Sequence, residues 1–128
     1  WPARQYALRF GRNRLFQAGV EHPLNALPMY TLANKNNFKI ISQYHFGGYG
    51  KVEQKLIEFI NLFYKQNNIP LDPVYTGKMV FGILDLLSKD YFPKGSKILI
   101  IHTGGLQGIT GMNQTLKLKN LPTINYYV

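Results

Sequence analysis

The sequence predicts an α/β protein, with a partial parallel sheet and flanking helices. Three observations lead to this prediction. A continuous apolar run occupies residues 97–102, apolar residues recur at helical spacing over residues 51–66 and 78–91, and residues 37–44 are rich in β-forming types. A strand without polar alternation is typical of a parallel sheet covered on both faces, and strands that alternate with helices are typical of the α/β class.

Composition limits the class of protein. Of the 128 residues, 45% are hydrophobic and 16% are charged, which is typical of a globular domain and not of a disordered chain. The chain has no cysteine, so disulfides and thiolate chemistry are excluded and a cytoplasmic location is favoured. No apolar run reaches the roughly 18 residues of a membrane span, and we predict no membrane partner. The three histidines lie far apart, and we predict no metal site.

The net charge of +9 is unevenly distributed. All four arginines lie within residues 1–14, whereas the lysines are scattered from Lys35 to Lys119. Scattered lysines are typical of a solvated surface, so a nucleic-acid partner is not favoured. The arginine-rich start leaves a second hypothesis open, in which the chain is a non-catalytic module that binds an anionic partner.

The residue types change near residue 33. Before it the chain uses Arg, Ala, Pro and Leu, and after it Lys, Asn, Ile, Phe and Tyr. We therefore predict that residues 1–33 are a basic leader and that residues 34–128 form the main part. Within the leader, residues 3–19 are compatible with a short basic helix that Gly19 ends.

Within residues 34–128, the first half is expected to contain a strand, a loop and a helix. Residues 37–44 alternate loosely and are expected to form a strand. The segment "HFGGYGK" (45–51) is expected to form a glycine-rich loop. Residues 51–66 are expected to form an amphipathic helix, and its apolar face carries Val52, Leu56, Phe59, Ile60 and Phe63.

The second half repeats this alternation. Residues 71–77 are expected to be a short extended piece, residues 97–102 a buried strand, and residues 103–112 a turn with a short helix. Residues 78–91 are expected to form a second helix, and its inner face carries Met79, Ile83, Leu86 and Leu87.

Polar groups follow two of these extended segments. One ends in Tyr-Thr-Gly before a helix, and the other ends in His-Thr-Gly-Gly. Ligands of open α/β sheets bind beyond the carboxyl ends of the strands, and parallel neighbours would bring both ends to one edge. The structural alternatives are an ordinary Gly-Gly turn, a core-edge Tyr75 and a helix-capping Thr76. No dinucleotide-binding or P-loop motif occurs.

Three stretches resemble a known family. They are "YHFGGYGKV" (44–52), "PLDPVYTGKMVFGILDLL" (70–87) and "FPKGSKILIIHTGGLQG" (92–108). They resemble the C-terminal part of pyridoxal-phosphate enzymes with the tryptophan-synthase β-like fold (fold type II). The most similar group is the D-cysteine desulfhydrase and 1-aminocyclopropane-1-carboxylate deaminase family. The resemblance runs from about residue 37 to about residue 121.

The resemblance implies pyridoxal 5'-phosphate as cofactor and a small amino acid as substrate. Tyr75 and Tyr49 match two tyrosines that approach the substrate from opposite sides, and they are the candidate catalytic residues. Thr103 matches a threonine that faces the pyridine nitrogen in the desulfhydrase branch. The remaining candidate cofactor contacts are His102, Gly104, Gly105 and Thr76.

Thr76 bears on the reaction type, because the resemblance places a glutamate at this position in the deaminase branch. A carboxylate stabilises a protonated pyridine nitrogen better than a hydroxyl does, and so gives a stronger electron sink. Thiol elimination is less demanding than ring opening. Thr76 therefore favours a desulfhydrase-like α,β-elimination that releases pyruvate, ammonia and sulfide, with the deaminase reaction as the alternative.

Two parts of the family pattern do not occur in these residues. The family's Schiff-base lysine lies in a segment resembling Ser-Gly-Asn-Lys-x-Arg-Lys, which is absent here, as is the glycine-rich loop that binds the cofactor phosphate. Neither Lys51 nor Lys78 matches the catalytic lysine. We therefore expect a C-terminal fragment that is inactive alone, from a family whose full-length members are expected to be homodimers.

Overall fold

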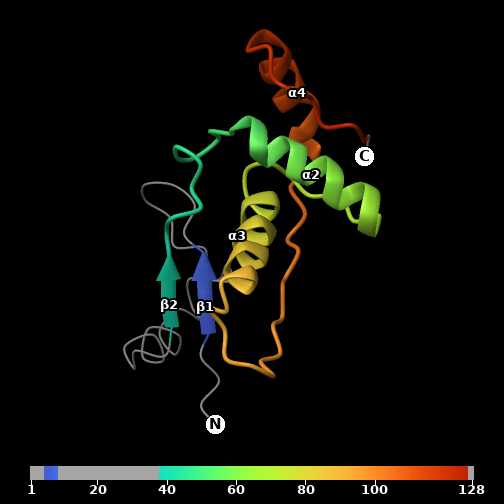
Figure 1. Ribbon diagram of the computed structural model, residues 1–128. Coiled ribbons are helices and arrows are strands. Elements are labelled where there is room, and N and C mark those ends of the chain that lie inside the picture. Colours follow the sequence, from blue (N-terminus) through green and yellow to red (C-terminus); the bar gives the residue numbers. More distant parts are fainter. Residues whose placement is uncertain (1–4, 9–37, 127–128) are drawn as a thin grey trace, which may run out of the picture.

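The computed structural model describes residues 5–8 and 38–126 (Figure 1). In chain order the elements are β1 (Gln5–Leu8), β2 (Phe38–Ile41), α2 (Gln54–Asn67), α3 (Thr76–Ser88), the 3₁₀ turn η2 (Leu106–Gly108) and α4 (Ile109–Leu118). β1 and β2 pair in parallel, with Gln5 opposite Phe38 and Leu8 opposite Ile41. The helix expected over residues 3–19 is thus wrong at β1, and the rest of that segment, with the arginines, lies outside the described residues.

The first predicted helix is observed as α2. Leu56 and Ile60 of its predicted apolar face are fully buried, and so is Ile57, which the prediction omitted. Val52, Phe59 and Phe63 are partly buried and pack against the same core. The helix ends at Asn68, which has a left-handed backbone (φ 55) and whose N–H donates to the Tyr64 carbonyl. Asparagine is one of the few residues that adopts this C-cap conformation readily.

The second predicted helix is observed as α3, which begins two residues earlier than expected, at Thr76. Its buried stripe includes Val80 and Leu86, whereas Leu87 is 44% exposed. The prediction that Leu87 faces inward is therefore wrong. Consecutive residues of a helix are about 100° apart around its axis, so Leu86 and Leu87 cannot both lie at the centre of one narrow face.

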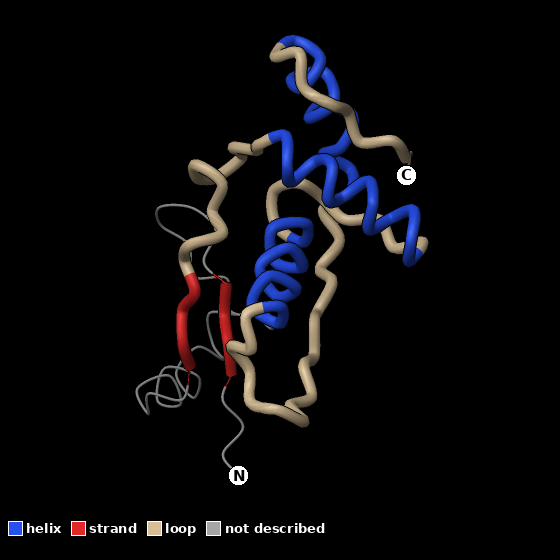
Figure 2. The backbone as a smooth tube through the Cα atoms, in the orientation of Figure 1, coloured by secondary structure: helices blue, strands red, loops and turns tan. Residues whose placement is uncertain are grey.

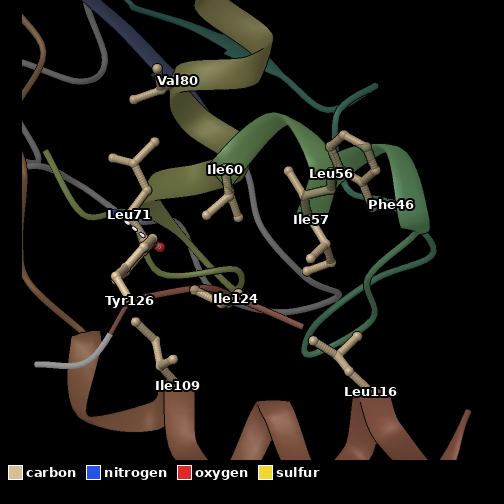
Figure 3. Packing of buried hydrophobic residues seen from close by; sticks show 10 residues of the cluster. All are labelled: Phe46, Leu56, Ile57, Ile60, Leu71, Val80, Ile109, Leu116, Ile124 and Tyr126. Atoms are coloured by element: carbon tan, nitrogen blue, oxygen red, sulfur yellow. Dashed lines mark hydrogen bonds between the residues drawn. The ribbon is translucent and has the colours of Figure 1, made fainter. Parts of the chain in front are cut away.

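The core joins α2, α3 and α4 to the segment that follows α4 (Figure 3). Figure 3 shows Ile124 and Tyr126 between the α4 residues Ile109 and Leu116 and the buried side chain of Leu71. The Tyr126 hydroxyl accepts a hydrogen bond from the Leu71 N–H (2.8 Å) and donates to the Leu71 carbonyl. This polar pairing satisfies a buried hydroxyl and fixes the chain just before α3.

The prediction of a buried strand at residues 97–102 is wrong for this structure. This segment is an extended loop that joins no described strand (Figure 2). Leu99 is 84% exposed, and Ile98, Ile100 and Ile101 are also exposed. A parallel strand requires neighbours to pair with its backbone, and none of the described residues fills that role. The predicted sheet is therefore reduced to the short β1–β2 pair.

Within the described ranges, no helix is both long enough and apolar enough to cross a membrane.

Candidate functional site

The start of α3 is organised by the carboxylate of Asp72. One carboxylate oxygen accepts the N–H groups of Val74 (2.8 Å) and Tyr75 (2.7 Å). The other accepts the N–H (2.8 Å) and the hydroxyl (2.7 Å) of Thr76. The Thr76 hydroxyl in turn accepts the N–H of Asp72 (2.8 Å). This reciprocal arrangement satisfies the free N–H groups of a helix start and fixes the backbone that carries Tyr75.

The glycine-rich loop 45–51 lies against this helix start. It is a double turn, in which Gly48 N–H donates to the His45 carbonyl (3.0 Å) and Lys51 N–H donates to the Gly48 carbonyl (3.2 Å). Gly47, Gly48 and Gly50 all have positive φ, a conformation that other residues rarely adopt. Phe46 is buried in the core and anchors one side of the loop, while Tyr49 is 65% exposed at its tip.

Tyr49 and Tyr75, which were singled out as candidate catalytic residues, lie together. The Tyr75 hydroxyl donates to the Tyr49 hydroxyl at 3.1 Å. The ring centroids are 6.0 Å apart and the rings are tilted by 59°, within the range of favourable aromatic pairs. The two residues are 26 positions apart and come from different elements. The pair offers two linked phenol groups at the start of α3.

The turn 102–105 lies beside the same helix start. His102 Nε2 is 2.8 Å from the Pro70 carbonyl, and Gly104 N–H donates to His102 Nδ1 (3.1 Å). Because Nδ1 accepts, the proton lies on Nε2, which donates to Pro70. A Cβ at Gly105 would lie 3.3 Å from the Asp72 carboxylate carbon. The two segments that were predicted to end at one edge of a sheet are therefore neighbours in the structure. Neither of them belongs to a described strand.

The two threonines of the prediction differ in their surroundings. Thr103 is exposed, and its hydroxyl bonds to no described residue. Thr76 is buried, and its hydroxyl donates to and accepts from Asp72. Thr103 is therefore the threonine with a hydroxyl available to a ligand. Thr76 is the first residue of α3 and follows the N-cap Tyr75, so the N-cap role considered for it is not observed; its hydroxyl accepts the Asp72 N–H ahead of the helix.

The prediction did not identify Asp72 as a functional residue. An Asp-Pro pair followed by a threonine four residues after the aspartate is a typical local signal, because short polar side chains bond to backbone N–H groups at helix starts. This spacing identifies Asp72 as the group that holds the start of α3.

The sequence comparison considers Lys78 only for the Schiff-base role, which it does not match. The structure gives this lysine a different role. Its ammonium donates to the carbonyls of His45 and Gly48, at 2.9 Å each. The side chain is buried, and this burial lowers its pKa to about 8, although Asp72 and Glu53 oppose the shift. Lys78, Gly82 and Leu86 follow one another at a spacing of four, so the sequence places this lysine on the buried stripe of α3.

Comparisons with known proteins identify relatives for part of the chain. It is 49% identical over 65 residues to a protein named putative 1-aminocyclopropane-1-carboxylate deaminase from Pyrococcus furiosus, which covers 51% of this chain and 19% of that protein. It is 38% identical over 78 residues to a 1-aminocyclopropane-1-carboxylate deaminase from Bradyrhizobium sp. (61% and 23%). It is 36% identical over 84 residues to one from Rhizobium rhizogenes (66% and 25%).

The resemblance inferred from the motifs is thus confirmed for proteins named 1-aminocyclopropane-1-carboxylate deaminase. The chain spans about a fifth to a quarter of the length of these relatives. No family model matches it.

Proposed function

Because this chain is homologous over half to two thirds of its residues to 1-aminocyclopropane-1-carboxylate deaminases, we propose that residues 34–128 contribute part of a pyridoxal-phosphate site for a small amino acid. One observation carries the proposal. Tyr49 and Tyr75, which the resemblance assigns to the substrate, have their hydroxyls 3.1 Å apart although they lie on separate elements.

The described residues fit the edge of such a cofactor. The exposed hydroxyl of Thr103 can face the pyridine nitrogen. Gly104 and Gly105 have positive φ, which favours glycine, and they leave this edge without side chains that would crowd the ring. The ammonium of Lys78 is bound to two carbonyls and does not fit the Schiff-base role. The described residues therefore fit contacts to the edge of the cofactor ring. The Schiff-base lysine and the residues that bind the cofactor phosphate are assigned to other parts of the protein.

The tyrosine pair is the part of the site that can handle a proton. The bound cofactor would supply an electron sink for the amino acid. The Tyr75 hydroxyl donates to Tyr49, so a proton can pass between the two oxygens without either side chain moving far. The exposure of Tyr49 leaves its ring accessible to a ligand, and the Asp72 contacts fix the backbone of Tyr75.

Of the two reactions, the proposal favours α,β-elimination from a D-cysteine-like amino acid. Thr76 stands where the deaminase branch has a glutamate, and its hydroxyl is occupied by Asp72. Among the described residues, the group proposed to face the pyridine nitrogen is then the Thr103 hydroxyl and not a carboxylate, which suits a reaction with a good leaving group. Deamination of 1-aminocyclopropane-1-carboxylate is the second candidate, because the relatives carry that name.

A stable conjugate tests the binding part of this proposal. The probe is phosphopyridoxyl-D-alanine, a reduced adduct of cofactor and amino acid that needs no lysine. We expect its titration into the ¹⁵N,¹³C-labelled chain to shift the NMR signals of Tyr49, Tyr75 and Thr103. Unchanged signals at these residues would contradict the proposal. A Tyr64→Phe variant, altered on α2, serves as the matched control and is expected to bind equally.

Activity of the chain alone is a separate test. With pyridoxal phosphate added, we expect neither sulfide from D-cysteine nor ammonia from 1-aminocyclopropane-1-carboxylate above the level of free cofactor, and no borohydride-trapped adduct at Lys78. Turnover, or a trapped adduct at Lys51 or Lys78, would show that this chain supplies its own amine.

Three further parts of the proposal rest on the sequence. They are the division into residues 1–33 and 34–128, a homodimeric full-length protein and a cytoplasmic location. Binding of an anionic partner by the leader stays a prediction, since its arginines lie outside the described residues.

A further inference from the structure

Lys78 is one of three buried polar or charged residues among those that the structure describes, together with Asp72 and Thr76. It is 1% exposed, and Val80 and Leu86 of the same helix are also buried. Burying an ammonium group has a large desolvation cost unless hydrogen bonds offset it. The only described partners of Lys78 Nζ are the carbonyls of His45 and Gly48. The lysine is thus held in place by the loop that carries Tyr49.

These two carbonyls are also the acceptors of the two turns that shape the loop. His45 O accepts the Gly48 N–H and Gly48 O accepts the Lys51 N–H. Each oxygen therefore receives one bond from the loop and one from Lys78. Glycines at positions 47, 48 and 50 leave the loop backbone with wide conformational freedom. The ammonium restricts that freedom by fixing the direction of both carbonyls.

Tyr75 is the N-cap of α3 and Lys78 lies in its first turn, three residues later. Their partners Tyr49 and Gly48 are adjacent in the loop. We propose that Lys78 is a positioning residue, which fixes the glycine-rich loop on α3 so that Tyr49 meets Tyr75. Its link to substrate handling rests on the proposed function. The positioning itself is a property of the free chain.

The variant Lys78→Met tests this proposal, because it keeps the length of the side chain and removes both donors. Two measurements report whether the loop stays fixed on α3. They are the cross-ring NOE between Tyr49 and Tyr75 and the hydrogen exchange of the Gly48 and Lys51 amides. We expect the NOE to disappear and the exchange to accelerate by about tenfold or more. The Ile60 methyl signal should stay in place, since this group packs on Gly77 and reports the α2–α3 contact.

Lys117→Met, an exposed lysine on α4, is the control and should change neither readout. A folded Lys78→Met chain that keeps the NOE and the slow exchange overturns the proposal. If Lys78→Met does not fold, Lys78→Gln takes its place, because its uncharged and shorter side chain weakens both bonds without burying an apolar group against the two carbonyls. We then expect a weaker NOE and faster exchange than in the parent chain, and a folded Lys78→Gln chain in which neither readout changes overturns the proposal. Should Lys78→Gln also fail to fold, Lys78 is a general core requirement and the proposal is rejected. The conjugate-binding test above fails or succeeds independently of these outcomes.

Discussion

Asp72 and Thr76 bind each other at both ends: the carboxylate of Asp72 accepts the backbone N–H and the hydroxyl of Thr76, and that hydroxyl accepts the N–H of Asp72. The pair is buried, and Asp72 bonds to the N–H of Tyr75 and lies next to Gly105 of the turn 102–105. The stability of the start of α3 therefore depends on two side chains.

Removing the carboxylate should be costly. We expect Asp72→Ala to lower the free energy of unfolding by about 3 kcal/mol, because four donors lose a charged acceptor in a buried site. Asp72→Asn, which keeps one acceptor oxygen, should lose less. Urea unfolding curves measure both. Glu58→Ala, an exposed acid on α2, is the control and should stay within about 0.5 kcal/mol of the parent chain. Equal losses at the two acidic positions would contradict the role of Asp72.

The hydroxyl of Thr76 can be tested with side chains of similar volume. Thr76→Val leaves the Asp72 N–H buried without its acceptor, so we expect a loss of about 1–2 kcal/mol. Thr76→Ser keeps the hydroxyl and should lose clearly less. Thermal unfolding of the two variants under one set of conditions provides the comparison. If serine were the more damaging substitution, packing of the threonine methyl would outweigh the hydrogen bond.

Gly77 allows α3 to approach α2. A Cβ at this position would lie 2.6 Å from Ile60 Cδ1 and 2.7 Å from the Asp72 carbonyl oxygen. We expect Gly77→Ala to destabilise the chain by about 2 kcal/mol or more. Gly111→Ala on α4 is the matched control, since its Cβ meets no atom within 4 Å, and it should gain about 0.5–1 kcal/mol from helix propensity. Urea midpoints that move in the same direction would contradict this account.

Stability should have a maximum near pH 10. Burial lowers the pKa of Lys78 from 10.5 to about 8, so the unfolded chain binds more protons between these values and stability rises with pH. Burial also raises the pKa of Tyr44 and Tyr126 from 10.0 to about 12, so the folded chain retains more protons there and stability falls.

Urea midpoints across this alkaline range measure the effect. Lys78→Met should lose the part of the rise that Lys78 contributes, and Tyr126→Phe should lose part of the fall. The quantity to compare is the difference in urea midpoint between each variant and the parent chain. A parent-minus-variant difference that does not change with pH would contradict the assignment.

Helical periodicity was sufficient to predict α2 and α3, because both bury one apolar stripe in a local core. The strand prediction for residues 97–102, which rests on a continuous apolar run, was wrong. An apolar run indicates that a segment can be buried, but only pairing partners make it a strand, and periodicity does not reveal partners. The inclusion of Ile57 and the exclusion of Leu87 from the core depend on how the helices pack, which the sequence pattern does not specify.

The tyrosine pair came from the family resemblance and not from any spacing, since Tyr49 and Tyr75 lie on separate elements. The two groups that organise the site, Asp72 and Lys78, were overlooked for another reason. Lys78 bonds to backbone atoms alone among the described residues, and three of the four groups that donate to the Asp72 carboxylate are backbone N–H groups. Backbone partners leave no complementary residue type in the sequence. Only the local Asp-Pro signal and the stripe shared with Gly82 hint at them.

The exposed ribbon 97–101 affects how this chain behaves in solution. Four aliphatic side chains, and a backbone that pairs with no strand in the described part of the chain, are presented together to solvent. Short apolar segments of high β propensity add to copies of themselves when their edges are open. We therefore expect copies of the isolated chain to associate through this segment against the repulsion of their +9 charge. Salt, which screens that charge, should shorten the time that the protein stays monomeric.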